Sequence, residues 1–344
     1  MHTLLFILYD SIFNSVFASQ VVAPLQARLD LMPGATATII SFEHSYVSSE
    51  QLTQLCTDPR IRILTLKKIP FIGTISLRYA AWQLASYIPT IDPSQIIARG
   101  PLAGWIISHA ESASTPIIVQ ARGLAAAEYL YAHRPTAWWH TFRAWQYERI
   151  ERYVYGRFAL RSNVTIHTVS KALRDYLITE WHTPEKKVSV AHYDIPASIA
   201  HETVQTWRAQ MRSQLNIAQD AYVYVYNGSA HAWQCPEETI AFFAQKYRSN
   251  TNTFLLILTH STDRFAALLR TQSIPESAYH ITCVPHAEIY RYLAIADAGL
   301  LFREQHCINW VSRPTKALEY QSVGLPIIHN DTIEMLTTKK RPSH

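Results

Sequence analysis

Short apolar runs alternate with helix-length amphipathic segments along almost the whole chain. In the first part, these runs lie at residues 4–8, 37–41, 61–66, 96–97, 117–119 and 164–168. Parallel strands that helices cover on both faces have continuous apolar runs, whereas strands with one solvated face alternate apolar and polar residues. The pattern therefore predicts a parallel β-sheet with connecting helices.

The alternation stops between residues 195 and 220, where one polar helix is predicted over 201–215, and then begins again. The second set of apolar runs lies at residues 222–226, 254–258, 280–284, 298–302 and 325–328. A chain of 344 residues is long enough for two domains, each with its own core. We therefore expect an α/β protein with two Rossmann-like domains, 1–195 and 221–344, joined by a linker and helix over 196–220. Ligands of such folds bind at the carboxyl ends of the strands, here in the crevice between the domains.

The composition narrows the class of protein. Hydrophobic residues make up 48% of the chain and charged residues 17%, which is typical of a globular protein. Lys and Arg total 31 against 26 for Asp and Glu, a net charge of +5 that suits anionic substrates or an anionic membrane surface. The basic residues lack the clustering expected of a nucleic-acid-binding protein, so we expect no nucleic acid as a partner. The four cysteines have no C-x-x-C spacing, which argues against a zinc site or a disulfide framework.

Other functional classes are disfavoured by missing motifs. The apolar opening at residues 1–10 lacks a basic segment and a small-residue cleavage site, and Asp10 interrupts it, so it reads as a buried first strand rather than a signal peptide. No run reaches the roughly 18 apolar residues that a membrane span needs. We therefore expect a cytoplasmic protein, with the inner face of the membrane as the alternative location. No G-x-G-x-x-G follows the first strand, which argues against a nicotinamide-dependent dehydrogenase.

The segment from Ser312 to Ile328 predicts a loop, a short helix and a buried strand. Pro314 suits the first turn of the helix, and Gly324 suits the left-handed residue just past its end. The free N–H groups and the positive dipole end of this helix favour a phosphate, to which Lys316 adds a mobile positive charge. Glu319 lies three residues further on the same helical face, where its carboxylate could accept hydrogen bonds from ribose hydroxyls.

This Pro-Thr-Lys…Glu-Tyr…Gly-x-Pro-Ile-Ile pattern resembles the nucleotide-sugar segment of GT-B glycosyltransferases, in particular the retaining group called family four. The resemblance extends to residues 226–229 with Trp233 and Gln234, to residues 289–299, and to residues 166–173. It implies transfer of a sugar from a nucleotide diphosphate donor to a glycan or lipid-linked acceptor, with retention of configuration, in surface polysaccharide synthesis. No Asp-x-Asp occurs in the chain, so the reaction is expected to need no metal, and the nucleotide sugar is a substrate rather than a cofactor.

The resemblance also assigns roles to individual residues. Arg303 and Lys316 would neutralise the diphosphate and Glu319 would bind the ribose, which makes these three the predicted catalytic residues. The remaining predicted donor-binding residues are Asn227, Gly228, Ser229, Gln234, Ser312, Pro314 and Thr315. Two simpler interpretations stay open: Arg303 as a solvated surface residue, and residues 227–229 as an ordinary strand-to-helix turn.

The sequence departs from the family pattern at two positions. Gln234 stands where relatives often carry a lysine, and Val311 stands where many carry a glutamate eight residues before Glu319. Relatives also continue beyond the strand at 325–328 through further helices, so we expect an incomplete C-terminal domain that is less stable than the first. A catalytically inactive nucleotide- or partner-binding remnant is therefore the main alternative function, and a nucleotide-sugar epimerase of the same architecture is a weaker one.

Candidate acceptor residues lie in the first domain. Arg99 and Arg122 each stand in an Ala-Arg-Gly triplet between an apolar strand and a helix, and Asn14 and Gln20 lie in and after the first strand-to-helix loop. Paired guanidinium groups suit an anionic acceptor or the donor phosphates. The alternative is that one of the arginines only fixes its own loop.

Residues 138–157 are dense in aromatic residues and arginine. This composition suits a helix at the headgroup boundary of a membrane, which would give the protein a peripheral membrane contact. The alternative is a helix that packs its aromatic face on the sheet and leaves its arginines in water.

Overall fold

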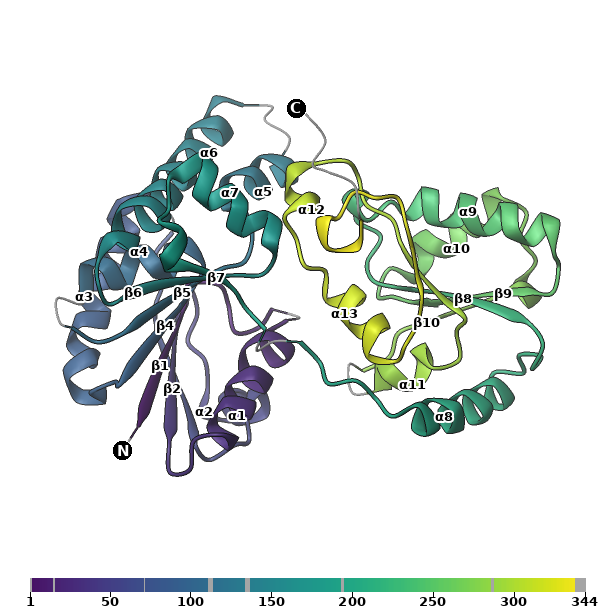
Figure 1. The fold of residues 1–344 in the computed structure, drawn as a ribbon, viewed down its shortest axis with the longest axis horizontal. Helices are drawn as coiled ribbons and strands as arrows, with labels where there is room; N and C mark the ends of the chain where they lie inside the picture. Colours follow the sequence, from purple (N-terminus) through teal and green to yellow (C-terminus); the bar gives the residue numbers. More distant parts are fainter. Residues whose placement is uncertain are drawn as a thin grey trace. The chain divides into compact units, whose positions relative to one another are not determined.

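The computed structural model describes residues 2–14, 16–70, 72–110, 114–133, 137–192, 195–285 and 288–337. The chain divides into two compact units, Met1–Asp194 and Ile195–His344. Each unit is built on one parallel β-sheet with helices on both faces (Figure 1). The predicted α/β fold with two Rossmann-like sheets is therefore confirmed.

The sheet of the first unit has seven strands in the order β3-β2-β1-β4-β5-β6-β7. Their bounds are β1 Thr3–Leu8, β2 Thr36–Glu43, β3 Ile61–Lys67, β4 Gln95–Arg99, β5 Ile117–Ala121, β6 Val164–Thr168 and β7 Val188–Val190. The six apolar runs of the sequence form the first six strands. The last strand was missed because it is three residues long and only Val188 in it is fully buried.

The connections run in opposite directions from β1, and this fixes which face each helix covers. The helical segments are η1 Ala18–Val22, α1 Ala23–Asp30, α2 Ser49–Leu55, α3 Thr74–Ile91, α4 Gly100–Ala110, α5 Ala125–His133, α6 Trp138–Glu151, η2 Arg152–Arg157, η3 Phe158–Leu160, α7 Lys171–Trp181 and η4 Glu185–Lys187. Because parallel crossovers are right-handed, α1 and α2 lie on one face and α3 to α7 on the other (Figure 1). The helices α1 and α2 therefore lie over the β1–β2–β3 half of their face.

The sheet of the second unit has five parallel strands in the order β10-β9-β8-β11-β12. These are β8 Tyr222–Asn227, β9 Thr253–Leu258, β10 Tyr279–Thr282, β11 Ala298–Leu301 and β12 Ile327–His329. Its helical segments are α8 His201–Gln214, η5 Ala232–Gln234, α9 Pro236–Ser249, α10 Thr262–Thr271, η6 Glu276–Ala278, α11 Ile289–Leu293, α12 Cys307–Trp310, α13 Thr315–Ser322 and η8 Glu334–Leu336. The five predicted strands of this part are all present.

The polar helix predicted at 201–215 is α8, and it packs within the second unit. Val204 and Met211 enter the core of this unit. The fully buried Arg212 donates hydrogen bonds to the Ile295 carbonyl and to Asp297 Oδ2, which lies 2.9 Å from its Nη2. These bonds hold α8 to the segment before β11, so the helix is a structural part of this unit.

In the part of the chain that the structure describes, no helix has both the length and the apolar character needed to cross a bilayer.

Candidate functional site

The carboxyl ends of β8 and β11 lie side by side in the second sheet. From β8 the chain continues to β9 on one side, whereas β11 pairs with β8 on the other side, so the strand order reverses between β8 and β11. Open α/β sheets bind ligands outside the carboxyl ends of the strands at such a reversal. Asn227 ends β8, and Arg303 follows β11 by two residues. The topology thus brings the two predicted loops to one place.

The helix α13 begins next to these two loops. Pro314 is its N-cap residue with φ −63°, and Gly324 ends the segment in the left-handed conformation at φ +73°. The N–H of Leu325 donates to the Tyr320 carbonyl oxygen at 2.9 Å, which closes the end of the helix before β12. The signals from proline and glycine therefore predicted the helix to within one residue at its start, and they place Lys316 in the first turn.

Gly228 allows the β8 loop and the first turn of α13 to approach each other closely. A Cβ atom built on Gly228 would lie 1.8 Å from Lys316 Nζ, and the φ of +149° is one that other residues rarely adopt. Any larger residue at this position would push the lysine side chain away. Glycine is thus required by both the backbone and the neighbouring amine.

Three of the predicted donor residues form one hydrogen-bonded group with Tyr226. Lys316 Nζ donates to Gln234 Oε1, and Gln234 Nε2 donates to Ser229 Oγ at 2.9 Å. The hydroxyl oxygen of the buried Tyr226 lies 2.7 Å from the Ser229 carbonyl oxygen and 3.0 Å from Gln234 Oε1. The Gln234 amide therefore holds the Lys316 amine and the Ser229 hydroxyl at the mouth of the β8 loop.

Arg303 is buried and forms no ion pair with a carboxylate in the part of the chain that the structure describes. Its side chain is 6% exposed, and Nη1 has no hydrogen-bond partner among the described residues. Burial lowers the pKa of Arg303. Burial also lowers the pKa of the half-buried Lys316 well below 10.5, and the positive charge of Arg303 lowers it further, against an opposing effect of Glu319. Two desolvated cations therefore lie near each other, and within the described ranges neither forms an ion pair with a carboxylate.

Glu319 and Asn227 lie beside the two cations and contact each other. Asn227 Nδ2 donates to Glu319 Oε2 at 2.7 Å, and the backbone N–H of Asn227 donates to the Tyr320 hydroxyl at 3.0 Å. The ring of Tyr320 packs over Gly299, where a Cβ atom would come within 2.5 Å of it. The side chain of Glu319 is buried, so its predicted contact with a ribose stays a prediction.

The other predicted donor residues lie just before the site. Ser312 Oγ donates to the Asn309 carbonyl oxygen at 2.8 Å, and Pro314 and Thr315 start α13. Val311 is buried and apolar, so no polar side chain stands at the position where the sequence resemblance implies a glutamate in many relatives. Among the described residues, no group of three or more His, Cys, Asp or Glu side chains could hold a metal ion.

In the first unit, two of the predicted acceptor residues come together at the carboxyl ends of β1 and β4. Arg99, which ends β4, donates from Nη2 to Gln20 Oε1 at 2.7 Å. Asn14 instead shapes its own loop, since its Nδ2 donates to the Ser11 carbonyl oxygen at 2.7 Å. Arg122 lies in the loop between β5 and α5.

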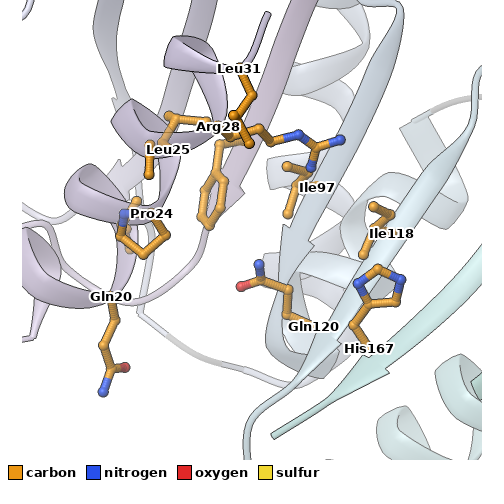
Figure 2. A pocket seen from close by; sticks show the side chains of 12 residues that line it. Gln20, Pro24, Leu25, Arg28, Leu31, Ile97, Ile118, Gln120 and His167 are labelled. Atoms are coloured by element: carbon orange, nitrogen blue, oxygen red, sulfur yellow. The ribbon is translucent and has the colours of Figure 1, made fainter. Parts of the chain in front are cut away.

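A cavity of about 400 Å³ lies between α1 and the sheet of the first unit. Figure 2 shows Gln120 and His167 on the strand side, and Gln20 and Arg28 on the helix side. The lining is mainly apolar, from residues such as Ile97. Gln20, which accepts the hydrogen bond from Arg99, is thus also one of the residues that line this cavity.

The sequence interpretation gave no role to three residues that position these loops, although Tyr226 and Tyr320 lie within the motifs that it quotes. Tyr226 and Tyr320 are neighbours of the predicted Asn227 and Glu319, so their places in the site could have been inferred from the strand and helix periods. Glu43, at the end of β2, accepts hydrogen bonds from Ser11 Oγ and from the N–H of Ile12, both at 2.9 Å. A carboxylate at the end of a buried strand was the available signal for Glu43.

Comparisons with known proteins support the fold. No protein-family model matches the chain, and no curated protein matches it in sequence. A glycosyltransferase from Rickettsia africae matches with a TM-score of 0.67 at 11% identity, over 96% of this chain and 79% of that one. WaaG, a glycosyltransferase involved in lipopolysaccharide biosynthesis, matches with a TM-score of 0.64 at 13% identity, over 96% and 82%. HepE from Anabaena, solved in complex with UDP and glucose, matches with a TM-score of 0.63 at 13% identity, over 98% and 82%.

Nucleotide-sugar epimerases match with lower scores. The UDP-GlcNAc 2-epimerase from Neisseria meningitidis, solved with UDP-GlcNAc bound, gives a TM-score of 0.53 at 13% identity over 87% of this chain and 77% of that one. The chain thus has the fold of GT-B glycosyltransferases, as the sequence resemblance implies.

Proposed function

We propose that this chain is a glycosyltransferase that takes a sugar from a nucleotide diphosphate donor and passes it to a glycan or lipid-linked acceptor. The observation that carries the proposal is the pair of basic side chains beside the carboxyl ends of β8 and β11, Arg303 and Lys316, neither of which forms an ion pair with a carboxylate among the described residues. A buried charge without a partner costs free energy, and a bound diphosphate would offset that cost.

In this proposal the diphosphate lies between Arg303 Nη1 and Lys316 Nζ, above the Gly228 backbone. Negative charge develops on the diphosphate as the bond to the sugar breaks, and two fixed cations stabilise it without any metal. Asn227, fixed by Glu319 and Tyr320, keeps the β8 loop in the position that this contact needs. Glu319 is then the group nearest the ribose side of the nucleotide.

The proposals for the acceptor and for the cellular location rest on the similarity to solved structures. WaaG acts in lipopolysaccharide biosynthesis, and HepE binds UDP and glucose, so a UDP-sugar and a surface polysaccharide are the first candidates for donor and product. We place the reaction in the cytoplasm, at the inner face of the membrane.

One observation favours the alternative of a nucleotide-binding protein without turnover. Val311 is buried and apolar where relatives carry a glutamate, and Gln234 is a neutral amide where relatives often carry a lysine. Such a chain would bind the nucleotide but would lack contacts to the donor sugar.

Release of UDP from UDP-glucose and related donors separates these functions. A transferase releases UDP slowly to water, and faster with an acceptor. A nucleotide-binding remnant is stabilised against heat by UDP but releases none from any donor. An epimerase converts the sugar of a free donor with no acceptor present. Absence of both UDP binding and donor turnover would overturn the proposal.

A further inference from the structure

The four cysteines of the chain differ in their surroundings. All four lie in the part of the chain that the structure describes, and Cys283 alone is exposed. Cys56 packs against the core of the first unit, and Cys235 packs against the core of the second. Burial, the largest of several causes, raises the pKa of the Cys235 thiol to about 11, which keeps it protonated and unreactive. Cys283 is therefore the thiol most open to a reagent in solution.

The side chain of Cys283 contacts a histidine that is itself exposed. Cys283 Sγ lies 3.0 Å from His260 Nδ1, which is within hydrogen-bond distance for a sulfur atom. A thiol becomes a strong nucleophile when it loses its proton, and a neighbouring imidazole is a group that accepts this proton in many reactive cysteine sites. A nucleophile and a base are therefore in contact at the surface of the second unit.

The backbone around both residues is held at the carboxyl ends of two paired strands. Cys283 directly follows β10, and His260 lies two residues after β9. The N–H of Thr259 donates to the Thr282 carbonyl oxygen at 2.9 Å, which joins the residue before His260 to the residue before Cys283. The N–H of Ser261 donates to Thr259 Oγ1 at 2.9 Å and fixes the loop on the other side of His260. The contact between thiol and imidazole is thus set by the pairing of the strands.

A second cysteine lies near a histidine, and its geometry is different. Cys307 Sγ lies 3.7 Å from His306 Nδ1. This nitrogen accepts a hydrogen bond from the N–H of Ile308 at 3.3 Å, because His306 is the N-cap residue of α12. A ring nitrogen that accepts a backbone N–H has its lone pair engaged, so it does not take the proton of a neighbouring thiol. In His260, by contrast, the contact of Nδ1 is with the thiol itself.

We propose that Cys283 is a modification site that forms a mixed disulfide with a low-molecular-weight disulfide of the glutathione class, with His260 as the proton acceptor. The Cys283 thiol gives its proton to His260 Nδ1, and the resulting thiolate attacks one sulfur of the small disulfide. The new S–S bond forms as the old one breaks, and the departing thiolate takes the proton from His260. The small disulfide is the oxidant, and one small thiol is released. This reaction involves the second unit alone and does not depend on the proposed sugar transfer.

Mass spectrometry of the full chain after incubation with oxidised glutathione tests the proposal. We expect one glutathionyl group per chain, on the peptide that contains Cys283, and its removal by a dithiol reductant. The variant Cys283→Ser should take up none. The variant His260→Asn keeps a hydrogen-bonding amide near the sulfur but has no proton acceptor. Cys283 should therefore react about tenfold more slowly in this variant, because a smaller fraction of it is thiolate.

The variant His306→Asn is the matched control. Asparagine is a good N-cap residue and preserves the start of α12, so Cys283 should react in this variant at the rate of the unchanged chain. Both histidine variants should also melt at the temperature of the unchanged chain, which separates a loss of the base from a disturbed fold. Adducts spread over the other three cysteines, a disulfide between two chains in place of the adduct, or equally fast reaction of His260→Asn would each overturn the proposal.

Discussion

Replacing Arg303 by methionine tests two quantities: the stability of the chain without ligand and its affinity for a nucleotide. The guanidinium is 6% exposed, its Nη1 has no partner among the described residues, and burial lowers its pKa. Removing a buried polar group that has no partner recovers about 1–3 kcal/mol, and methionine keeps most of the packed stem. We therefore expect Arg303→Met to be more stable than the unchanged chain in the absence of ligand.

The same substitution should weaken nucleotide binding. A hydrogen bond to a charged group contributes about 1.5–3 kcal/mol, so the Kd for UDP should rise roughly 10- to 200-fold. The assays are thermal denaturation without ligand and calorimetric titration with UDP. The apo melting temperature should rise by about 2–4 °C for each kcal/mol of stability gained.

Arg264 provides the control for this substitution. It lies in the same unit on α10, its side chain is 59% exposed, and its partner is the carboxylate of Glu237. Exposed ion pairs contribute little, so Arg264→Met should change stability by less than about 1 kcal/mol and leave the UDP affinity unaltered. If Arg303→Met instead lowered the melting temperature and bound UDP as tightly as the unchanged chain, Arg303 would be a structural residue and the argument for a diphosphate site would fail.

Two further predictions follow from the shifted pKa values. The pKa of Lys316 is lower in the folded chain than the usual 10.5. At pH values between the folded pKa and 10.5, the unfolded chain binds one more proton than the folded chain, so the free energy of unfolding rises with pH. Lys316→Met should remove this rise, as measured by urea titrations, and should also weaken UDP binding. An unchanged pH dependence would show that Lys316 is solvated. Burial raises the pKa of Glu151 to about 8, so its stabilising contribution, complete below its usual 4.5, is lost as the pH rises through 8. Glu151→Gln should therefore lose less stability than the unchanged chain between about pH 5 and about pH 9, and an equal loss in both would contradict this account.

Most of the fold could be predicted because both sheets are parallel and covered on both faces. Strands such as β1 and β9 are almost entirely apolar, so their positions are visible without any partner. The strand β7 could not be predicted in this way, because only one of its three residues is buried. The start and end of α13 could be predicted because Pro314 and Gly324 act through the local backbone alone.

The side-chain arrangement of the site could be predicted only in part. The loop of β8 and the start of α13 were expected near a phosphate, and the topology brings them together. The bond between Asn227 and Glu319 joins residues 92 positions apart, so its existence depends on how the helix packs on the sheet. The Gln234 amide holds Lys316 for the same reason. Periodicity also could not orient α6, because its aromatic residues suit either the core or the surface. The burial of Ala144 and Glu151 leaves Trp138, Phe142 and Trp145 exposed.

The central claim is that a diphosphate binds where Arg303 and Lys316 of the second unit face the β8 loop. The most direct test is a crystal structure of the full chain with UDP at a saturating concentration. The account predicts phosphate oxygens within hydrogen-bond distance of Arg303 Nη1 and Lys316 Nζ, above Gly228. Bound UDP with its phosphates elsewhere, or an unliganded site at a concentration that saturates binding in solution, would contradict it.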